Sequence, residues 1–316
     1  MKIIVFIESS NDKIHLVSLE ALVAAQKLKS DSDSEVHIIT FDKNLANQLS
    51  EYKSNSVIHV ENSNLHQYNP LCYLETLKQI HSKLNPDIVI FGHTYETRDW
   101  VPRLSAKLDI PFISDCTSYN DSEELLSFNR PIYQAKLTQK LSLTSNKALI
   151  SFQAGSYSTD DLEFENSNIE NFDIDLSSVS NTIKPGEKFQ ESSGGVDLTA
   201  ADYIVSVGRG IGKEENILLA QNFADKIKAQ IGSSRPVVDA GWLDHSRQIG
   251  SSGQTVSPKL YFALGISGAI QHLVGMKGSK QIIAINKDPN APIFEIADYA
   301  VIGDLLEILP KLTDNL

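Results

Sequence analysis

The sequence predicts an α/β protein with two domains, and three observations lead to that prediction. The chain has 316 residues, enough for two domains of about 150 residues that each bury a core. Short apolar, β-branched runs alternate with segments of helical period, which is typical of a parallel sheet with helices on its faces. The 41% hydrophobic and 22% charged residues are those of a globular chain and argue against intrinsic disorder.

The first domain begins with a buried strand and continues with alternating helices and strands. Between the second and third strands the pattern leaves two orders open, one with an intervening helix and one without. The turn pair Asn85-Pro86 follows the helix expected over residues 71–84 and precedes the buried strand expected over residues 87–92. We expect strands over residues 2–7, 35–41, 57–60 and 87–92, and helices over residues 16–28, 71–84 and 98–108.

An antiparallel hairpin is expected to close the first domain. Two extended runs, residues 132–143 and 147–157, are joined by a polar turn at residues 144–146. Pairing of these two runs would make the sheet of this domain mixed.

A linker is expected between the two domains. Residues 158–196 are rich in Ser, Asn, Asp and Glu and end in Ser192-Ser193-Gly194-Gly195, which is the composition of a surface excursion and a linker. We therefore place the N-terminal domain at residues 1–193 and the C-terminal domain at residues 197–316.

The second domain is expected to be doubly wound and Rossmann-like. A helix should begin near Lys213, after the first strand and its glycine turn. We expect strands over residues 203–207, 236–239, 260–264, 281–286 and 299–303.

Glycine and polar clusters gather at the ends of these strands. Gly208-Arg209-Gly210-Ile211-Gly212 has the spacing GxGxG and not GxGxxG, and about half of such turns are purely structural, so alone it establishes no nucleotide site. Further clusters follow at residues 233–235, 248–253, 265–272 and 286–289. Because the carboxyl ends of parallel strands converge on one crevice, the set predicts a large, phosphate-bearing ligand, and a dinucleotide fits best.

Charge and cysteine usage exclude several classes of function. The 28 basic and 40 acidic residues give a net charge of −12, which repels phosphate backbones and argues against a nucleic-acid partner. Cys72 and Cys116 have no spacing typical of a zinc site. No apolar run reaches the ~18 residues that span a bilayer, and no targeting segment is recognised, so we expect a cytoplasmic protein that is not embedded in a membrane.

Three strings of the second domain carry a family resemblance. They are SRPVVDAGW at 234–242, GISGAIQHLVGMK at 265–277 and AINKDPNAPIFEIADY at 284–299, and residues 85–115 add a looser match in the first domain. With these strings the chain resembles the alpha subunit of electron transfer flavoprotein. The resemblance implies that the C-terminal domain binds FAD and that the N-terminal domain contacts a beta subunit in a heterodimer.

The resemblance also implies roles for individual side chains. Arg235 would lie beside the flavin ring and stabilise negative charge on reduced flavin, while His272 would act as a donor near N1 and O2. Ser252 stands where the family usually has Thr and would offer its hydroxyl to N5, and Ser251 replaces a Gln, so the flavin potential is expected to differ. The other residues implied to bind the cofactor are Arg209, Ser234, Gln248, Gly250, Gly253, Gly265, Ser267, Gly268, Ala269, Ile270, Gln271, Asn286 and Asp304.

The function that this resemblance implies is electron transfer without a substrate of its own. The FAD would accept electrons from dehydrogenases of the acyl-CoA dehydrogenase type, as in fatty acid β-oxidation, and deliver them to electron transfer flavoprotein:quinone oxidoreductase or another acceptor. No nucleophile, base and orienting group are recognised together in the sequence. Two alternatives stay open: a flavin-dependent oxidoreductase that uses NADH directly, including an electron-bifurcating family member, and a scaffold subunit that has lost its flavin.

Overall fold

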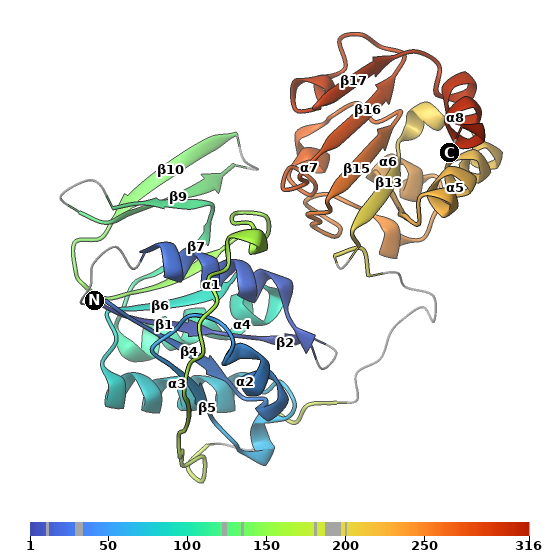
Figure 1. Cartoon of the computed structure of the whole chain (residues 1–316). Helices are drawn as coiled ribbons and strands as arrows, with labels where there is room; N and C mark the ends of the chain where they lie inside the picture. Colours follow the sequence, from blue (N-terminus) through green and yellow to red (C-terminus); the bar gives the residue numbers. More distant parts are fainter. Residues whose placement is uncertain are drawn as a thin grey trace. The chain divides into compact units, whose positions relative to one another are not determined.

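The chain folds into two compact units (Figure 1). The computed structural model describes residues 1–10, 13–28, 34–121, 125–133, 136–179, 182–186, 197–199 and 201–315. Contacts divide the chain into Met1–Lys188 and Phe189–Leu316. The predicted linker Ser192–Gly195 lies outside the described residues, so the predicted domain limits at residues 193 and 197 stay predictions.

A parallel sheet forms the centre of the first unit. Its described strands stand in the order β12-β5-β4-β1-β6-β11-β7, and every neighbouring pair is parallel. The strands are β1 (Lys2–Phe6), β4 (Glu35–Thr40), β5 (Ser56–His59), β6 (Ile88–Gly92), β7 (Phe112–Cys116), β11 (Ala148–Phe152) and β12 (Ile169–Asn171), beside a small pair β2 (Ser9–Ser10) and β3 (Lys13–Ile14).

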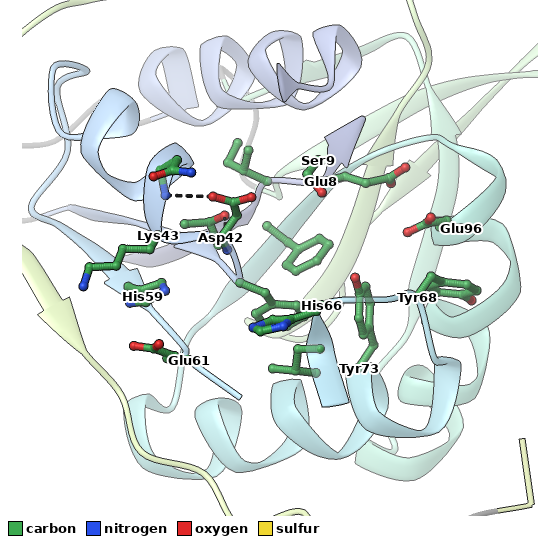
Figure 2. A pocket seen from close by; sticks show the side chains of 16 residues that line it. Glu8, Ser9, Asp42, Lys43, His59, Glu61, His66, Tyr68, Tyr73 and Glu96 are labelled. Carbon is green, nitrogen blue, oxygen red and sulfur yellow. Dashed lines mark hydrogen bonds between the residues drawn. The ribbon is translucent and has the colours of Figure 1, made fainter. Parts of the chain in front are cut away.

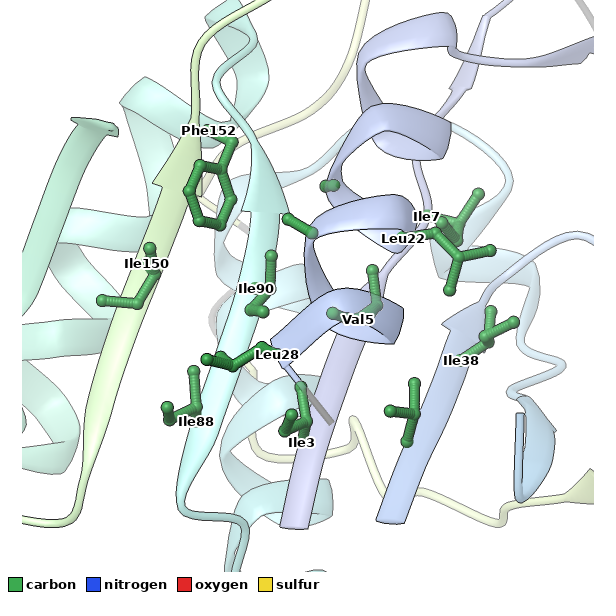
Figure 3. Close-up of a cluster of buried hydrophobic side chains, with 14 of the residues drawn as sticks. Ile3, Val5, Ile7, Leu22, Leu28, Ile38, Ile88, Ile90, Ile150 and Phe152 are labelled. Atoms are coloured by element: carbon green, nitrogen blue, oxygen red, sulfur yellow. The ribbon is translucent and has the colours of Figure 1, made fainter. Parts of the chain in front are cut away.

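Helices cover both faces of this sheet because its central strands are apolar on both sides. Ile3 and Val5 of β1 belong to the core cluster that α1 and α2 complete, while Ile4 and Phe6 belong to the opposite cluster with α3 and α4. Figure 3 shows the first cluster beneath α1. The helices are α1 (Leu16–Leu28), α2 (Lys43–Leu49), α3 (Pro70–Leu84) and α4 (Tyr95–Leu108).

The ends of two helices are set by capping side chains. Asp42 accepts hydrogen bonds from the backbone N–H groups of Asn44 and Leu45 and starts α2, so the order with an intervening helix is the one adopted. Thr94 accepts from the N–H of Thr97 at 3.1 Å, which starts α4 three residues before the predicted position.

The predicted hairpin was wrong in its pairing. β10 (Leu137–Ser142) pairs antiparallel with β9 (Ser127–Ile132), which also pairs with β8 (Ser118–Asn120), in a separate small sheet. β11 instead lies between β6 and β7 as a parallel strand. All five residues of β11 are buried, whereas those of β10 are exposed or half-buried, and a strand that is apolar on both faces belongs inside a helix-covered sheet. The main sheet is therefore parallel and not mixed.

The second unit has a smaller parallel sheet, in the order β14-β13-β15-β16-β17. Helices α5 and α8 cover one face, while segments with little regular structure cover the other. The elements are β13 (Tyr203–Val207), α5 (Ile217–Lys226), β14 (Gln230–Ser233), α6 (Arg235–Asp239), β15 (Leu260–Leu264), α7 (Ile270–Leu273), β16 (Ile282–Asn286), β17 (Tyr299–Ile302) and α8 (Leu305–Asp314).

Two predictions for this unit need correction. The strand predicted over residues 236–239 is the short helix α6, and the strand of that region is β14, just before it. Pro236 lies in the first turn of α6, where its missing N–H and fixed φ suit a helix. The helix expected near Lys213 begins only at Ile217, after two short 3₁₀ turns.

Cys72 and Cys116 are both free and buried. None of the described helices is long and apolar enough to cross a bilayer.

Candidate cofactor site

The candidate site lies at the carboxyl edge of the second unit's sheet, where the strand order reverses. From β13 the chain passes to β14 on one side and then returns to β15 on the other side of β13. In open α/β sheets, ligands bind in the crevice outside the carboxyl ends of two such strands. The turns that follow β13 and β15 are therefore the expected centre of a binding site.

These two turns pack directly against each other. The N–H of Gly210 donates to the carbonyl of Gly265 at 3.0 Å, and a Cβ on Gly208 would lie 2.3 Å from that same carbonyl oxygen. Gly265 itself has a φ of +63°, which L side chains rarely adopt. The glycines thus bring the two turns into backbone contact.

The segment after β15 leaves backbone donors without partners. Within the described part of the chain, no hydrogen bond uses the N–H groups of Ser267, Gly268, Ala269 or Ile270. Ala269 precedes the four-residue helix α7, and its side chain makes no capping bond. Arg209 lies exposed in the facing turn. Adjacent unpaired N–H groups, with an arginine in the turn that packs against this segment, suit a pyrophosphate, so the residues present fit a dinucleotide cofactor.

Residues 248–253 form a loop that joins the end of β14 to α7. The N–H of Ile249 donates to the carbonyl of Ser233 at 2.8 Å, and the N–H of Ser251 donates to that of Gln271 at 2.7 Å. Gln248 is buried, and its Nε2 donates to the carbonyl and to Oγ of Ser252 at 2.9 and 3.0 Å. Ser252 Oγ accepts here, so its own O–H is left to donate elsewhere.

His272 is held inside the chain through both ring nitrogens. Nδ1 lies 3.0 Å from the carbonyl of Ile249, which can only accept, so Nδ1 carries the proton. Nε2 lies 2.9 Å from Oη of Tyr261 and accepts from it when the ring is neutral. Burial lowers the pKa of His272 to about 4, although the Ile249 carbonyl opposes this shift. His272 is therefore a neutral imidazole at pH 7.

A donor role of His272 toward a flavin stays a prediction. Both ring nitrogens already have partners, so a bond from this ring to a flavin would require one of the two contacts to break. Tyr261, the second residue of β15, had no predicted role, and only its hydroxyl near the start of a buried strand could have marked it.

Arg235 begins α6, immediately after the end of β14. Its Nε lies 3.3 Å from the Asp239 carboxylate, and 68% of its side chain is exposed. An exposed ion pair contributes little free energy, so a ligand can compete for this guanidinium. Ser234 is buried beside it and donates its N–H to the carbonyl of Val207 at 3.0 Å, which ties this turn to β13.

Two predicted contact residues have structural partners instead. Asn286 donates from Nδ2 to the carbonyl of Ile266 at 2.9 Å, which fixes the turn after β15. Asp304 caps α8 by accepting from the N–H of Leu306 at 2.8 Å. A role of either side chain toward the cofactor stays a prediction.

The predicted residues are brought together to different degrees. The turns at 208–210 and 265–268, the loop 248–253 and α7 are joined by direct contacts. Asn286 is the last residue of β16, and Arg235 and Asp304 each come two residues after the ends of β14 and β17, at the same edge of the sheet. Within the residues that the structure describes, no three His, Cys, Asp or Glu side chains could hold a metal ion.

Comparisons with known proteins identify the family to which the chain is similar. The family model described as electron transfer flavoprotein domain matches residues 3–176, and the one described as electron transfer flavoprotein FAD-binding domain matches residues 197–277. A solved benzoylformate decarboxylase from Polynucleobacter necessarius aligns at 10% identity over 99% of this chain and 58% of its own, with a TM-score of only 0.25.

Curated relatives agree with the family models over the length of the chain. Three proteins named electron transfer flavoprotein subunit alpha match it. The Bacillus subtilis protein is 38% identical over 81% of this chain and 78% of its own. The proteins from Thermoanaerobacterium thermosaccharolyticum and Syntrophomonas wolfei are each 33% identical, over 99% of this chain and 96% and 98% of their own. The chain therefore belongs to the electron transfer flavoprotein alpha-subunit family, and its C-terminal part is the family's FAD-binding domain.

Proposed function

We propose that this chain is the alpha subunit of a heterodimeric electron carrier and holds FAD at the carboxyl edge of its second sheet. When bound, FAD supplies the redox chemistry, and the protein contributes binding, orientation and electrostatics. The observation that carries the proposal is the segment after β15, which combines unpaired backbone N–H groups with a match to an FAD-binding domain.

The groups at this edge would either bind the cofactor or adjust the reduction potential of its flavin. Residues 267–270 and Arg209 would hold the pyrophosphate through N–H groups and a cation. Arg235 would place positive charge near the flavin, which favours a reduced, negatively charged ring. Ser252 would offer its O–H to the ring while Gln248 fixes its position.

His272 would support the loop 248–253 and not act as an ionised donor. Its Nδ1–H holds the carbonyl of Ile249, one residue before Gly250, and Tyr261 holds the other side of the ring. Because this ring is neutral, Arg235 would be the group that balances negative charge on the flavin.

The partners of the carrier are proposed from the family resemblance. A beta subunit would pair with the N-terminal unit, a dehydrogenase of the acyl-CoA dehydrogenase type would donate electrons, and electron transfer flavoprotein:quinone oxidoreductase or another acceptor would receive them. The relatives' shared name, subunit alpha, supports the pairing with another subunit.

Mixing experiments test the direction of electron flow. The chain is coexpressed with its beta subunit, and the flavin absorbance is followed by stopped flow after mixing with reduced acyl-CoA dehydrogenase or with NADH. We expect reduction by the dehydrogenase and none by NADH alone. Fast reduction by NADH would instead favour an oxidoreductase or an electron-bifurcating carrier, which a second acceptor would distinguish.

A further inference from the structure

A cavity of about 340 Å³ opens at the carboxyl edge of the first unit's sheet (Figure 2). It is lined by the residues that end or follow β1, β4 and β5, and by Glu96 in the first turn of α4, the helix after β6. β1 and β6 are neighbours from which the chain continues to opposite sides of the sheet. Such a reversal is the usual ligand position in open α/β sheets. No residue that lines the cavity belongs to the candidate cofactor site, whose residues are all in the second unit.

Aromatic rings build one wall of the cavity. The rings of Phe41 and Tyr73 meet edge to face at 4.9 Å between centroids, and Tyr68 meets Tyr73 in the same way at 5.2 Å. Phe6 packs on Phe41 at 5.1 Å from the side of the core. These contacts hold the rings in place, so the wall is preformed and offers π faces and edges to a ligand.

The hydroxyl of Tyr73 points into this space without a partner. Only 9% of the residue is exposed, and its Oη is directed toward Glu8 and Glu96 in Figure 2. Within the described residues no hydrogen bond to this hydroxyl is formed. Burial and then the charges of Glu96 and Glu8 raise the pKa of Tyr73, which agrees with both carboxylates facing it. Because this hydroxyl has no protein partner and lines the cavity, a ligand atom that enters the cavity can pair with it.

The charge of the lining selects the sign of that ligand. The lining contains four carboxylates and a single ammonium group, that of Lys43, so its carboxylates and ammonium group together carry a formal charge of −3. Such a lining repels phosphate and attracts a cation. The carboxylates belong to Glu8, Asp42, Glu61 and Glu96.

The carboxylates are not arranged to hold a metal ion. Asp42 caps the N-terminus of α2 by accepting from the N–H of Asn44, and Glu8 accepts from Oγ1 of Thr94 at 2.5 Å. Across the described ranges, no trio of His, Cys, Asp and Glu side chains has the proximity that a metal ion needs. The cation that fits is therefore one that also uses the aromatic wall.

We propose that this cavity binds a small organic amine in its protonated form. The ammonium group donates to Oη of Tyr73 and to the carboxylate of Glu96, and the apolar body of the amine lies against the ring of Phe41. The proposal does not depend on FAD binding, because no residue is shared between the two sites.

Isothermal titration calorimetry of the purified full-length chain tests this with a matched pair of probes. 2-Phenylethylamine carries the ammonium and an aromatic body, and 2-phenylethanol has the same body without the charge. We expect the amine to bind and the alcohol to bind at least about tenfold more weakly. AMP serves as the phosphate-bearing probe and should show no binding in the first unit.

Two substitutions locate the binding. Tyr73→Phe removes only the hydroxyl and Glu96→Gln removes only a charge, and each should weaken binding of the amine about tenfold. Glu51→Gln, an exposed carboxylate outside the cavity, is the control and should leave the affinity unchanged. Circular dichroism and flavin content verify that each variant is folded. Absence of amine binding, equal binding of the alcohol, or full affinity in folded Tyr73→Phe and Glu96→Gln would overturn the proposal.

Discussion

At the scale of single residues, His272 shows how burial sets the protonation of a side chain. The sequence places this histidine in a string typical of the family, which suggested a donor. The structure surrounds it with the Ile249 carbonyl and the Tyr261 hydroxyl, and burial lowers its pKa to about 4. The string could identify the position, but it could not reveal the partners, because both come from distant segments.

The lowered pKa of His272 predicts a stability that depends on pH. The folded state keeps the ring neutral while the unfolded chain binds a proton below its pKa of about 6.5, so stability falls as pH drops from 7 toward 4. Between pH 7 and pH 5, His272 should lower the free energy of unfolding by about 2 kcal/mol. Urea unfolding of the wild type and of His272→Gln at both pH values measures the difference.

His93 of the first unit also has a pKa lowered to about 4, mainly by burial, so the comparison must be made between variants. The loss on acidification should be about 2 kcal/mol smaller in His272→Gln. An identical loss in both proteins would show that His272 is not neutral in the fold.

Arg235 is the residue for which a redox effect is predicted. Its side chain is mostly exposed and weakly paired, so Arg235→Ala should change the free energy of unfolding by less than about 0.5 kcal/mol. The midpoint potential of the bound flavin should fall by about 30 mV, equivalent to about 1.4 kcal/mol for a two-electron couple. Spectroelectrochemical titration measures it, with Arg235→Lys as a control that keeps the charge. A potential that does not change in Arg235→Ala would place the guanidinium away from the ring.

At the scale of elements, strands with continuous apolar runs could be predicted from the sequence. The strands with which they pair in the sheet could not. β1, β6 and β15 appear close to their predicted limits. β11 was assigned to a hairpin because a polar turn precedes it, yet its five buried residues place it inside the sheet. β14 escaped prediction because QIGS has little apolar character and is buried by segments that come later in the chain.

The position of β11 predicts an asymmetry between two apolar substitutions. Ile150 is fully buried in the sheet, whereas 57% of Leu137 in β10 is exposed. Ile150→Ala should lower the free energy of unfolding by about 2–5 kcal/mol, and Leu137→Ala by less than about 0.5 kcal/mol. Chemical denaturation of both variants checks this. Similar costs would support the hairpin that the sequence suggested.

At the scale of the whole molecule, the two units have separate cores. Each sheet is enclosed by its own buried clusters, and the chain divides between them near residue 188. A ligand stabilises only the unit that binds it. We expect two unfolding transitions in differential scanning calorimetry, of which FAD raises only the one that belongs to the second unit. A single transition that FAD shifts as a whole would contradict independent units.

The cofactor site was more predictable than the cavity of the first unit. The glycine turn at 208–212 and the string at 265–277 are each recognisable as short runs of sequence, and the pairing of β13 with β15 brings them together. The lining of the cavity comes from single residues, such as Glu8, Tyr73 and Glu96, that are far apart in the sequence. Nothing in the sequence around each of them marks a site, and only the fold brings them to one place.

The flavin content of the purified complex tests the central claim most directly. The chain is purified with its beta subunit, and bound flavin is released, identified by chromatography and related to the protein concentration. The account predicts that FAD is bound to this chain in a ratio of about one, and that Gly268→Val, which places a side chain against the backbone of Ile293, loses it while the first unit stays folded. A folded complex in which the second unit carries no FAD would contradict the account.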